Sequence, residues 1–296
     1  MDIEDLHAFI TVARHGSFSQ AAGILHLTQP AVSKRVAALE QTLDTRLFDR
    51  IGRRITLTEA GRTLLSRAEK ILAEVEDSRR AIINLAGEIR GRLSIATSHH
   101  IGLHRLPPVL RQFTRQYPHV QLDLCFMDSE AACRAVGQGE QELAVVTLPP
   151  AESTDLIAIP VWNDPLALVS APDHPLCKKP RLTLAQLCDY PAILPAKGTY
   201  TRGLIERAFD KPGKPLRVNL ETNYLETIKM MVSIGLGWSF LPQTMVDESL
   251  CTHRLKALRI VRRLGIVHHA RRTLSNAARA LMTVCLTHAD SDIRAR

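Results

Sequence analysis

The sequence predicts a mixed α/β chain made of a small helical domain, one long helix and a larger domain of alternating strands and helices. Three patterns lead to this expectation. Apolar residues recur at helical spacing from 6 to 43, the stretch 59–89 lacks proline and keeps a helical apolar repeat, and short apolar runs alternate with helical segments beyond 91. We therefore expect a small helical domain at 1–58, a linker helix at 59–90 and a larger α/β domain at 91–296.

Composition limits the class of protein. The chain has 296 residues, a formal net charge of +8 and a pI near 9.4, which favours polyanionic partners such as DNA. No apolar run reaches the roughly 18 residues of a membrane span, and the acidic start Met1-Asp2-Ile3-Glu4-Asp5 does not resemble a secretory signal. We expect a cytoplasmic protein with no membrane contact. Six scattered cysteines form no C-x-x-C pair, so we predict neither a zinc ribbon nor a disulfide framework. We also expect no bound metal and no cofactor.

Three short helices are delimited by residues that stop and start helices. Gly16 ends the first helix, Ser17-Phe18-Ser19-Gln20 is a capping box for the second, and Thr28 with Pro30 begins the third. We expect the buried face of the third helix to consist of Val32, Val36, Leu39 and Leu43. Two short helices with a tight turn and a polar second helix are typical of a helix-turn-helix, although a plain three-helix bundle fits the same pattern.

The polar face of the third helix suits contact with base edges. Gln29 can pair bidentately with adenine, and Lys34 or Arg35 can reach guanine or a phosphate. The segment that follows strengthens the DNA-binding interpretation.

That segment, 48–58, predicts a wing. It consists of a turn that bears Arg50, Arg53 and Arg54, followed by a short strand, and Gly52 permits the bend. Arginines on such a turn can contact phosphates or a minor groove.

These segments resemble the LysR-type family of transcription regulators. The resemblance covers 1–65 without a gap and rests on Ala21-Ala22-x-x-Leu25, Thr28-Gln29-Pro30-Ala31-Val32-Ser33, Leu39-Glu40-x-x-Leu43, Leu47-Phe48-x-Arg50 and Leu57-Thr58-Glu59-Ala60-Gly61. One departure is Asp44, where the family usually has glycine; aspartate tolerates the left-handed conformation that this position needs. The resemblance implies a winged helix-turn-helix whose third helix enters the major groove. The implied readers are Thr28, Gln29, Pro30, Ser33 and Lys34, with Arg50, Arg53 and Arg54 on the backbone or in a minor groove.

The long helix carries a heptad seam. It consists of Leu64, Ala68, Ile71, Val75, Ser78, Ile82, Leu85 and Ile89. An isolated rod would expose this seam to water, so the helix needs either a partner helix or its own C-terminal domain. Resemblance to the family implies an antiparallel dimer through this helix.

Alternating strands and helices beyond Gly91 resemble the family's effector domain, which has two α/β lobes of the periplasmic-binding-protein type. The landmarks are Leu106-Pro107-Pro108, Tyr117-Pro118, His174-Pro175-Leu176 and Gly235-x-Gly237-x-x-x-Leu241-Pro242. We expect strands at 157–161, 166–170 and 264–269 among others. Lobe I would comprise 91–161 and 265–296 and lobe II 162–264, with hinge crossings near 161–165 and 264–268.

Three segments qualify for an effector site between the lobes, where strand ends meet helix starts. Their residues are Ser98, His99 and His100, then Thr147, then Thr199, Tyr200 and Thr201. Hydroxyls and free backbone N–H groups favour a small anion, although each Ser or Thr also fits the role of a helix cap. His100 is hypothesised to help hold this anion, either by adding positive charge or by titrating near neutral pH.

Three other functions are alternatives to a regulator with a small-molecule effector. The sequence has no H-E-x-x-H, G-x-S-x-G, Walker loop or complete G-x-G-x-x-G, so we expect no enzyme and no catalytic residues. A metal sensor would use His100 and His104, which are spaced i, i+4. A redox sensor would use Cys177 and Cys188, although Cys188 lies on an apolar helix face typical of an inert thiol.

Resemblance to the family also implies the partners. Dimers associate into a tetramer, contact an imperfect palindrome in double-stranded DNA, and change the recruitment of RNA polymerase when a small-molecule effector shifts the lobes. The effector must bind one arrangement more tightly than the other for this shift to occur.

Overall fold

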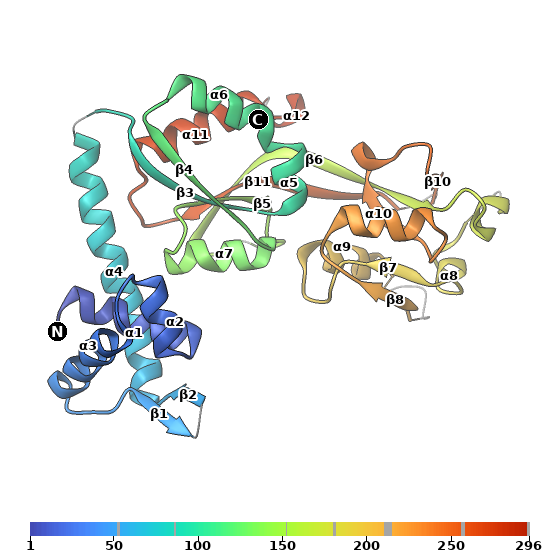
Figure 1. Ribbon diagram of the computed structural model, residues 1–296. Coiled ribbons are helices and arrows are strands. Elements are labelled where there is room, and N and C mark those ends of the chain that lie inside the picture. Colours follow the sequence, from blue (N-terminus) through green and yellow to red (C-terminus); the bar gives the residue numbers. More distant parts are fainter. Residues whose placement is uncertain are drawn as a thin grey trace. The chain divides into compact units, whose positions relative to one another are not determined.

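The computed structural model describes residues 1–51, 54–85, 87–151, 153–179, 182–209, 215–255 and 258–294. The chain divides into two compact units, Met1–Ala86 and Gly87–Arg296 (Figure 1). Among the described residues, no helix combines the length and the apolar character that a membrane crossing requires.

The first unit begins with three helices, α1 (Ile3–His15), α2 (Phe18–Ile24) and α3 (Gln29–Thr42). Gly16 ends α1 with φ 62°, Ser17 accepts a hydrogen bond from the Gln20 amide at 3.3 Å, and the Thr28 hydroxyl accepts one from the Ala31 amide at 3.4 Å. The starts and stops that the sequence predicts are therefore where the structure has them.

The core of this unit joins the three helices to the wing. Phe48 lies 5.4 Å from Phe9 and 5.9 Å from Phe18, measured between ring centroids, and Val32, Val36 and Leu39 are buried beneath them. Leu43 does not join the core as expected. It is the residue that ends α3 and is 39% exposed, because the chain turns there through Asp44 at φ 47°.

The wing is a hairpin of β1 (Phe48–Ile51) and β2 (Arg54–Leu57), paired antiparallel with Phe48 opposite Leu57. The sequence predicted a strand only after the turn. The first strand forms because Glu40 accepts hydrogen bonds from the amides of Leu47 (2.7 Å) and Phe48 (3.3 Å) and so fixes the entry to the hairpin. Gly52 and Arg53 lie outside the described residues.

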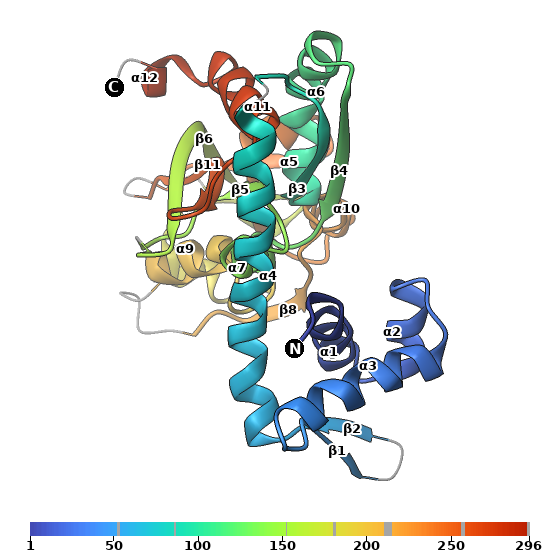
Figure 2. The same cartoon turned by 90° about the vertical axis from the view of Figure 1, so that its left-hand side faces the viewer.

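The long helix α4 (Glu59–Leu85) completes the first unit (Figure 2). Its first part packs on the core through Leu64 and Ala68, whereas further along the seam Ile82 is 70% and Leu85 86% exposed. The helix ends four residues earlier than the seam predicted. Ile89 lies beyond the end and packs against the core of the second unit instead of extending the seam.

The second unit is built on one curled sheet of seven strands. Their order is β10-β6-β11-β5-β3-β4, with β9 pairing β6 at the side. The bounds are β3 (Gly91–Thr97), β4 (Val120–Phe126), β5 (Leu143–Thr147), β6 (Leu156–Ser170), β9 (Ser239–Pro242), β10 (Cys251–His253) and β11 (Ile260–His269). A separate parallel pair consists of β7 (Ala192–Leu194) and β8 (Val218–Glu221).

Helices cover this sheet as two lobes (Figure 1). The first lobe has α5 (His99–His104), α6 (Leu106–Gln116), α7 (Ser129–Gln138), α11 (Asn276–Thr287) and α12 (Ser291–Arg294). The second has η1 (Pro175–Lys178), α8 (Leu184–Leu187), α9 (Tyr200–Phe209), α10 (Leu225–Ser233) and η2 (Gln243–Met245). Each lobe has its own core, around Phe113 in the first and around Trp238 in the second.

Two long antiparallel strands, β6 and β11, run from one lobe into the other. The sequence predicted two separate strands at 157–161 and 166–170, but β6 is continuous over 15 residues. The register with β11 shifts between Leu264 and Gly265, and this irregularity accommodates Pro160, whereas Pro165 pairs with Val261 in regular register. Gly265 lies directly against the Ile159 carbonyl, where a side chain would not fit.

Candidate functional site

The N-terminal turns of α3 present a polar surface. Thr28, Gln29, Pro30 and Lys34 are exposed, and Ser33 is half-buried between them. The Gln29 side chain donates from Nε2 to the Ser33 hydroxyl at 2.8 Å, which orients its amide along the helix. The structure therefore brings together the residues expected to read bases, on the face opposite the buried stripe.

Arg35 differs from its neighbours on α3. Its guanidinium forms an ion pair with Glu4 of α1, so it is engaged inside the domain. Arg50 and Arg54 lie on the two wing strands, and Arg53 falls outside the described residues. The side chains of these three wing arginines are not part of the description.

A small cavity of about 50 Å³ lies between the two lobes. It is bounded where β3, β5 and β7 end and where α5, α7, α9 and α10 begin. Its lining consists of Ser98, His99, His100, Asp128, Ser129, Glu130, Thr147, Pro195, Thr199, Thr201, Asn223, Leu225 and Arg262. All residues expected at an effector site line it except Tyr200. Tyr200 packs instead against the apolar cluster that includes Ala132, Cys133 and Val136 of α7.

The hydroxyl groups of the lining differ in what they already do. Ser98 precedes α5 without making a side-chain capping bond within the described chain. Thr199 is a working cap, because its Oγ1 accepts from the Arg202 amide at 3.2 Å. Ser129 Oγ accepts from the Thr147 amide at 3.1 Å, so Thr147 is held in place through its backbone. The Ser98 hydroxyl is therefore the one best placed to serve a ligand.

Arg262 supplies positive charge to the cavity, and sequence reasoning missed it. It is 4% exposed and donates from Nε to Asp164 Oδ2 at 2.9 Å and from Nη1 to Thr201 Oγ1 at 3.3 Å. Arg105 Nη2 lies 3.7 Å from Asp164 Oδ1. Two guanidinium groups thus share one carboxylate, although the carboxylates of Asp128 and Glu130 in the same lining offset the positive charge that remains.

His100 is buried in the cavity wall as a neutral ring. It is 5% exposed, and neither ring nitrogen has a hydrogen-bond partner among the described residues. Burial, and then the charge of Arg262, lower the pKa of His100 to about 3. The expectation that His100 adds charge or titrates near neutral pH does not fit this environment. A neutral imidazole with free nitrogens can still donate one hydrogen bond to a ligand.

Two carboxylates of the first lobe accept hydrogen bonds from the second lobe across the cavity. Asp128 Oδ2 accepts from Asn223 Nδ2 at 2.7 Å, and Glu130 accepts a hydrogen bond from the Tyr200 amide at the start of α9. Positive helix-dipole charge makes that amide a place where an anion would bind. The chain's own Glu130 thus occupies an anion position of the cavity.

The histidine pair considered for metal binding is helical, as that hypothesis required. A ring nitrogen of His104 lies 3.0 Å from Glu226 Oε1, and His100 Nδ1 lies 3.9 Å from it. However, the same positive charge of Arg262 that disfavours a proton on His100 also disfavours a cation there. We therefore assign no metal to this group.

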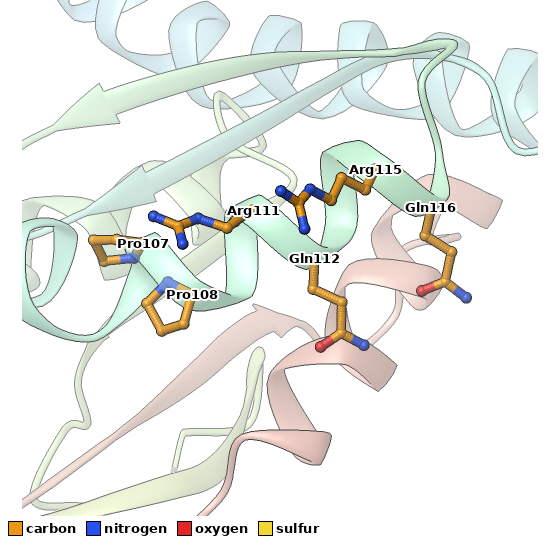
Figure 3. A pocket seen from close by; sticks show the side chains of 6 residues that line it. All are labelled: Pro107, Pro108, Arg111, Gln112, Arg115 and Gln116. Carbon is orange, nitrogen blue, oxygen red and sulfur yellow. The ribbon is translucent and has the colours of Figure 1, made fainter.

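A wider hollow of about 550 Å³ lies on the first lobe. Figure 3 shows its six lining side chains, which all belong to α6 and include Arg111 and Arg115. A hollow lined by one helix is an open surface and does not enclose a small molecule.

The winged helix-turn-helix and the two-lobed domain with its interlobe cavity define a DNA-binding regulator with an effector-binding domain. The family model described as "Bacterial regulatory helix-turn-helix protein, lysR family" matches residues 3–62, and "LysR substrate binding domain" matches residues 86–290. The chain therefore belongs to the LysR family of transcription regulators, which confirms the resemblance and the two-lobed fold, and it is not an enzyme.

Individual relatives and a solved structure also point to a transcription regulator. An uncharacterized HTH-type transcriptional regulator of Azotobacter vinelandii is 68% identical over 108 residues, 36% of this chain and 75% of that one. The uncharacterized HTH-type transcriptional regulator YeiE of Escherichia coli (strain K12) is 32% identical over 288 residues, 96% of each chain. A full-length OxyR variant of Pseudomonas aeruginosa superposes with a TM-score of 0.71 at 25% identity, covering 96% of this chain and 94% of that one.

Proposed function

We propose that two copies of this chain read an imperfect palindrome in double-stranded DNA through α3, in the cytoplasm. The support is a polar row on a helix with a buried apolar stripe; the row consists of exposed Thr28, Gln29, Pro30 and Lys34 and half-buried Ser33. Gln29 would pair with adenine and Lys34 would reach guanine or phosphate, while wing arginines hold the backbone. Arg35 has a lesser part, since Glu4 already neutralises it.

The two copies pair through α4. The support is the exposed apolar row that includes Ile71, Val75, Ile82 and Leu85, which is too apolar to stay in water along a rod. A dimer places two α3 helices in successive major grooves, and dimers of dimers then contact a neighbouring site. Effector-driven changes in this assembly alter recruitment of RNA polymerase.

The effector is a small anion that binds between the lobes. The single observation that carries this proposal is Arg262, a buried guanidinium on the cavity wall beside the unengaged Ser98 hydroxyl and the orphaned His100 ring. Asp164 already accepts from Nε and Nη2 of Arg262, so the donor that an oxyanion would use is Nη1, which donates here to Thr201 of the cavity lining.

The cavity is small in this structure, at about 50 Å³, enough for a few waters. In this account an entering anion displaces the Glu130 carboxylate from the Tyr200 amide and parts the two lobes. When the effector replaces the Glu130 carboxylate, it binds the open arrangement of the lobes more tightly than the closed one. This difference in affinity is what shifts the population toward the open arrangement.

The experiment has two arms. Chromosomal binding sites of the protein would be mapped, and the purified protein would be screened by thermal shift against small carboxylates and oxyanions, each paired with its neutral amide or ester. We expect anions to raise the melting temperature and their neutral partners to leave it unchanged, since a ligand that prefers the folded state stabilises it. Stabilisation by the neutral partners alone would reject the anionic effector while leaving DNA recognition intact.

A further inference from the structure

A second cluster of polar side chains lies in the second lobe and is separate from the cavity lining. Cys177 is on η1, and Cys251 and His253 are on β10. Each offers one ligand atom, and the three atoms lie within 4.8 Å of one another. All three residues are half-buried, so the cluster is accessible to solutes.

The fold builds this cluster from two segments that are remote in sequence. Side chains two apart on a strand point to the same face, so β10 presents Cys251 and His253 together. That strand pairs antiparallel with β6, where Cys251 lies opposite Ser170. The turn after β6 then returns Cys177 to the same place, with its Sγ 3.3 Å from the Ala171 carbonyl.

Ser170 ties the three groups together. It is fully buried, and its Oγ lies 2.8 Å from His253 Nε2 and 3.6 Å from Cys177 Sγ. A hydroxyl in this position can hold the imidazole or the thiolate in orientation, as residues around metal ligands commonly do.

The spacing and chemistry of the set match a tetrahedral thiophilic ion. At zinc–sulfur distances of about 2.3 Å and zinc–nitrogen distances of about 2.0 Å, ligand atoms of a tetrahedral site lie about 3.5 to 3.8 Å apart. The ligand atoms of Cys177, Cys251 and His253 lie within 4.8 Å of one another, so small side-chain rotations bring them to these distances. Two sulfurs and one imidazole nitrogen are soft ligands that select Zn²⁺ or Cu⁺ over Mg²⁺ and Ca²⁺.

We propose that Cys177, Cys251 and His253 form a metal site for a thiophilic d¹⁰ cation, with Zn²⁺ as the ion that this ligand set fits. Binding releases the two thiol protons to solvent and leaves the fourth coordination position to water. This proposal departs from the expectation that the chain binds no metal, which rested on the absence of a C-x-x-C pair. The pairing of β10 with β6 supplies the proximity that the sequence spacing lacks.

The test measures metal binding directly, without DNA or effector. Full-length protein, reduced and freed of metal, is titrated with Zn²⁺ against a chromogenic chelator and separately with Co²⁺. We expect about one Zn²⁺ per chain and a Co²⁺ thiolate charge-transfer band in the near ultraviolet. Cys251→Ser and His253→Gln should each weaken Zn²⁺ binding at least about tenfold, a loss at the lower end for disturbed metal sites. Cys125→Ser is the matched control, because Cys125 is equally half-buried but lies on β4.

Three results would overturn the site. The first is that the wild type binds no Zn²⁺ and shows no thiolate band with Co²⁺. The second is that Cys251→Ser and His253→Gln, shown to be folded by circular dichroism, bind Zn²⁺ as tightly as Cys125→Ser. The third is that, in mass spectra of freshly reduced protein exposed to air, oxygen closes Cys177 and Cys251 into a disulfide before added Zn²⁺ occupies them. A Cu⁺ titration with a competing chelator then shows which d¹⁰ ion the cluster prefers.

Discussion

Arg262 and Asp164 face each other across β11 and β6, and the guanidinium Nε donates to Asp164 Oδ2 at 2.9 Å. Both side chains are buried, at 4% and 0% exposure, in the strands that join the two lobes. Each buried charge depends on the other, because an unpaired ion in this position would lose its hydration without compensation. The pair therefore fixes the charge of the cavity wall and also the path of the connecting strands.

Removing one member of this pair should be costly. We expect Asp164→Asn and Arg262→Met each to lower the free energy of unfolding by about 3 to 5 kcal/mol, as breaking a buried pair does, and the double variant to lower it by less than their sum. Denaturant unfolding of the four proteins measures this coupling. Strict additivity of the two single losses would show that the ion pair does not act as a unit.

Ser98 and Thr183 form a matched test of ligand against cap. Thr183 makes a full capping box on α8, whereas Ser98 makes no side-chain capping bond among the described residues. Thr183→Ala should lower the free energy of unfolding by about 1 kcal/mol and leave effector affinity unchanged. Ser98→Ala should change stability little and weaken the anion found by screening about tenfold, the effect of one lost hydrogen bond. The opposite pattern would make Ser98 structural.

Glu130 should oppose the effector. Gln at this position keeps an oxygen that can accept from the Tyr200 amide but removes the charge that competes with an incoming anion. We expect Glu130→Gln to raise anion affinity about tenfold, which corresponds to about 1.4 kcal/mol. Glu248→Gln is the control. It removes the same charge from an exposed residue that is not part of the cavity lining. Equal or lower affinity in Glu130→Gln would exclude the competition.

His100 should make the fold sensitive to acid. Its pKa is lowered to about 3 by burial, Arg262, His104 and Arg105, against an opposing effect of Glu226. Since the unfolded chain takes up the proton near pH 6.5, this histidine's contribution is complete above that pH and is lost as the pH falls toward 3. Over this range the wild type should lose up to about 1.4 kcal/mol per pH unit more than His100→Gln. Denaturant unfolding of both proteins between pH 7 and pH 4 measures the difference. Parallel profiles would show that His100 is not held neutral.

The sequence was most informative where structure is determined locally. Gly16, Ser17 and Thr28 mark helix ends through bonds to residues at most four positions away, so these ends could be predicted from the chain alone. The left-handed conformation of Asp44, which the resemblance to the family implied, is also present, with φ 47°.

Features that depend on residues far apart in the sequence could not be predicted in this way. The sequence around Arg262 does not indicate that this arginine lines the cavity. Its position depends on the ion pair with Asp164, which is 98 residues away. Three-residue β10 has too little pattern to predict, so Cys251 and His253 could not be placed beside Cys177. Pro160 and Pro165 led to the prediction of two separate strands, because proline normally marks a strand end; a shifted register that the sequence does not reveal accommodates Pro160.

DNA recognition by α3 is the central claim, and a comparison along one helix tests it most directly. Binding to a mapped chromosomal site would be measured for Gln29→Ala, Lys34→Ala and the exposed control Gln41→Ala at two or more salt concentrations. We predict that Gln29→Ala loses about 1 to 3 kcal/mol of DNA-binding free energy and discriminates less between bases. Lys34→Ala should weaken DNA binding and reduce the slope of log K against log salt concentration by about one. Gln41→Ala should bind like the wild type. Unchanged affinity, base preference and salt slope in both Gln29→Ala and Lys34→Ala would contradict the assignment of α3 as the helix that reads DNA.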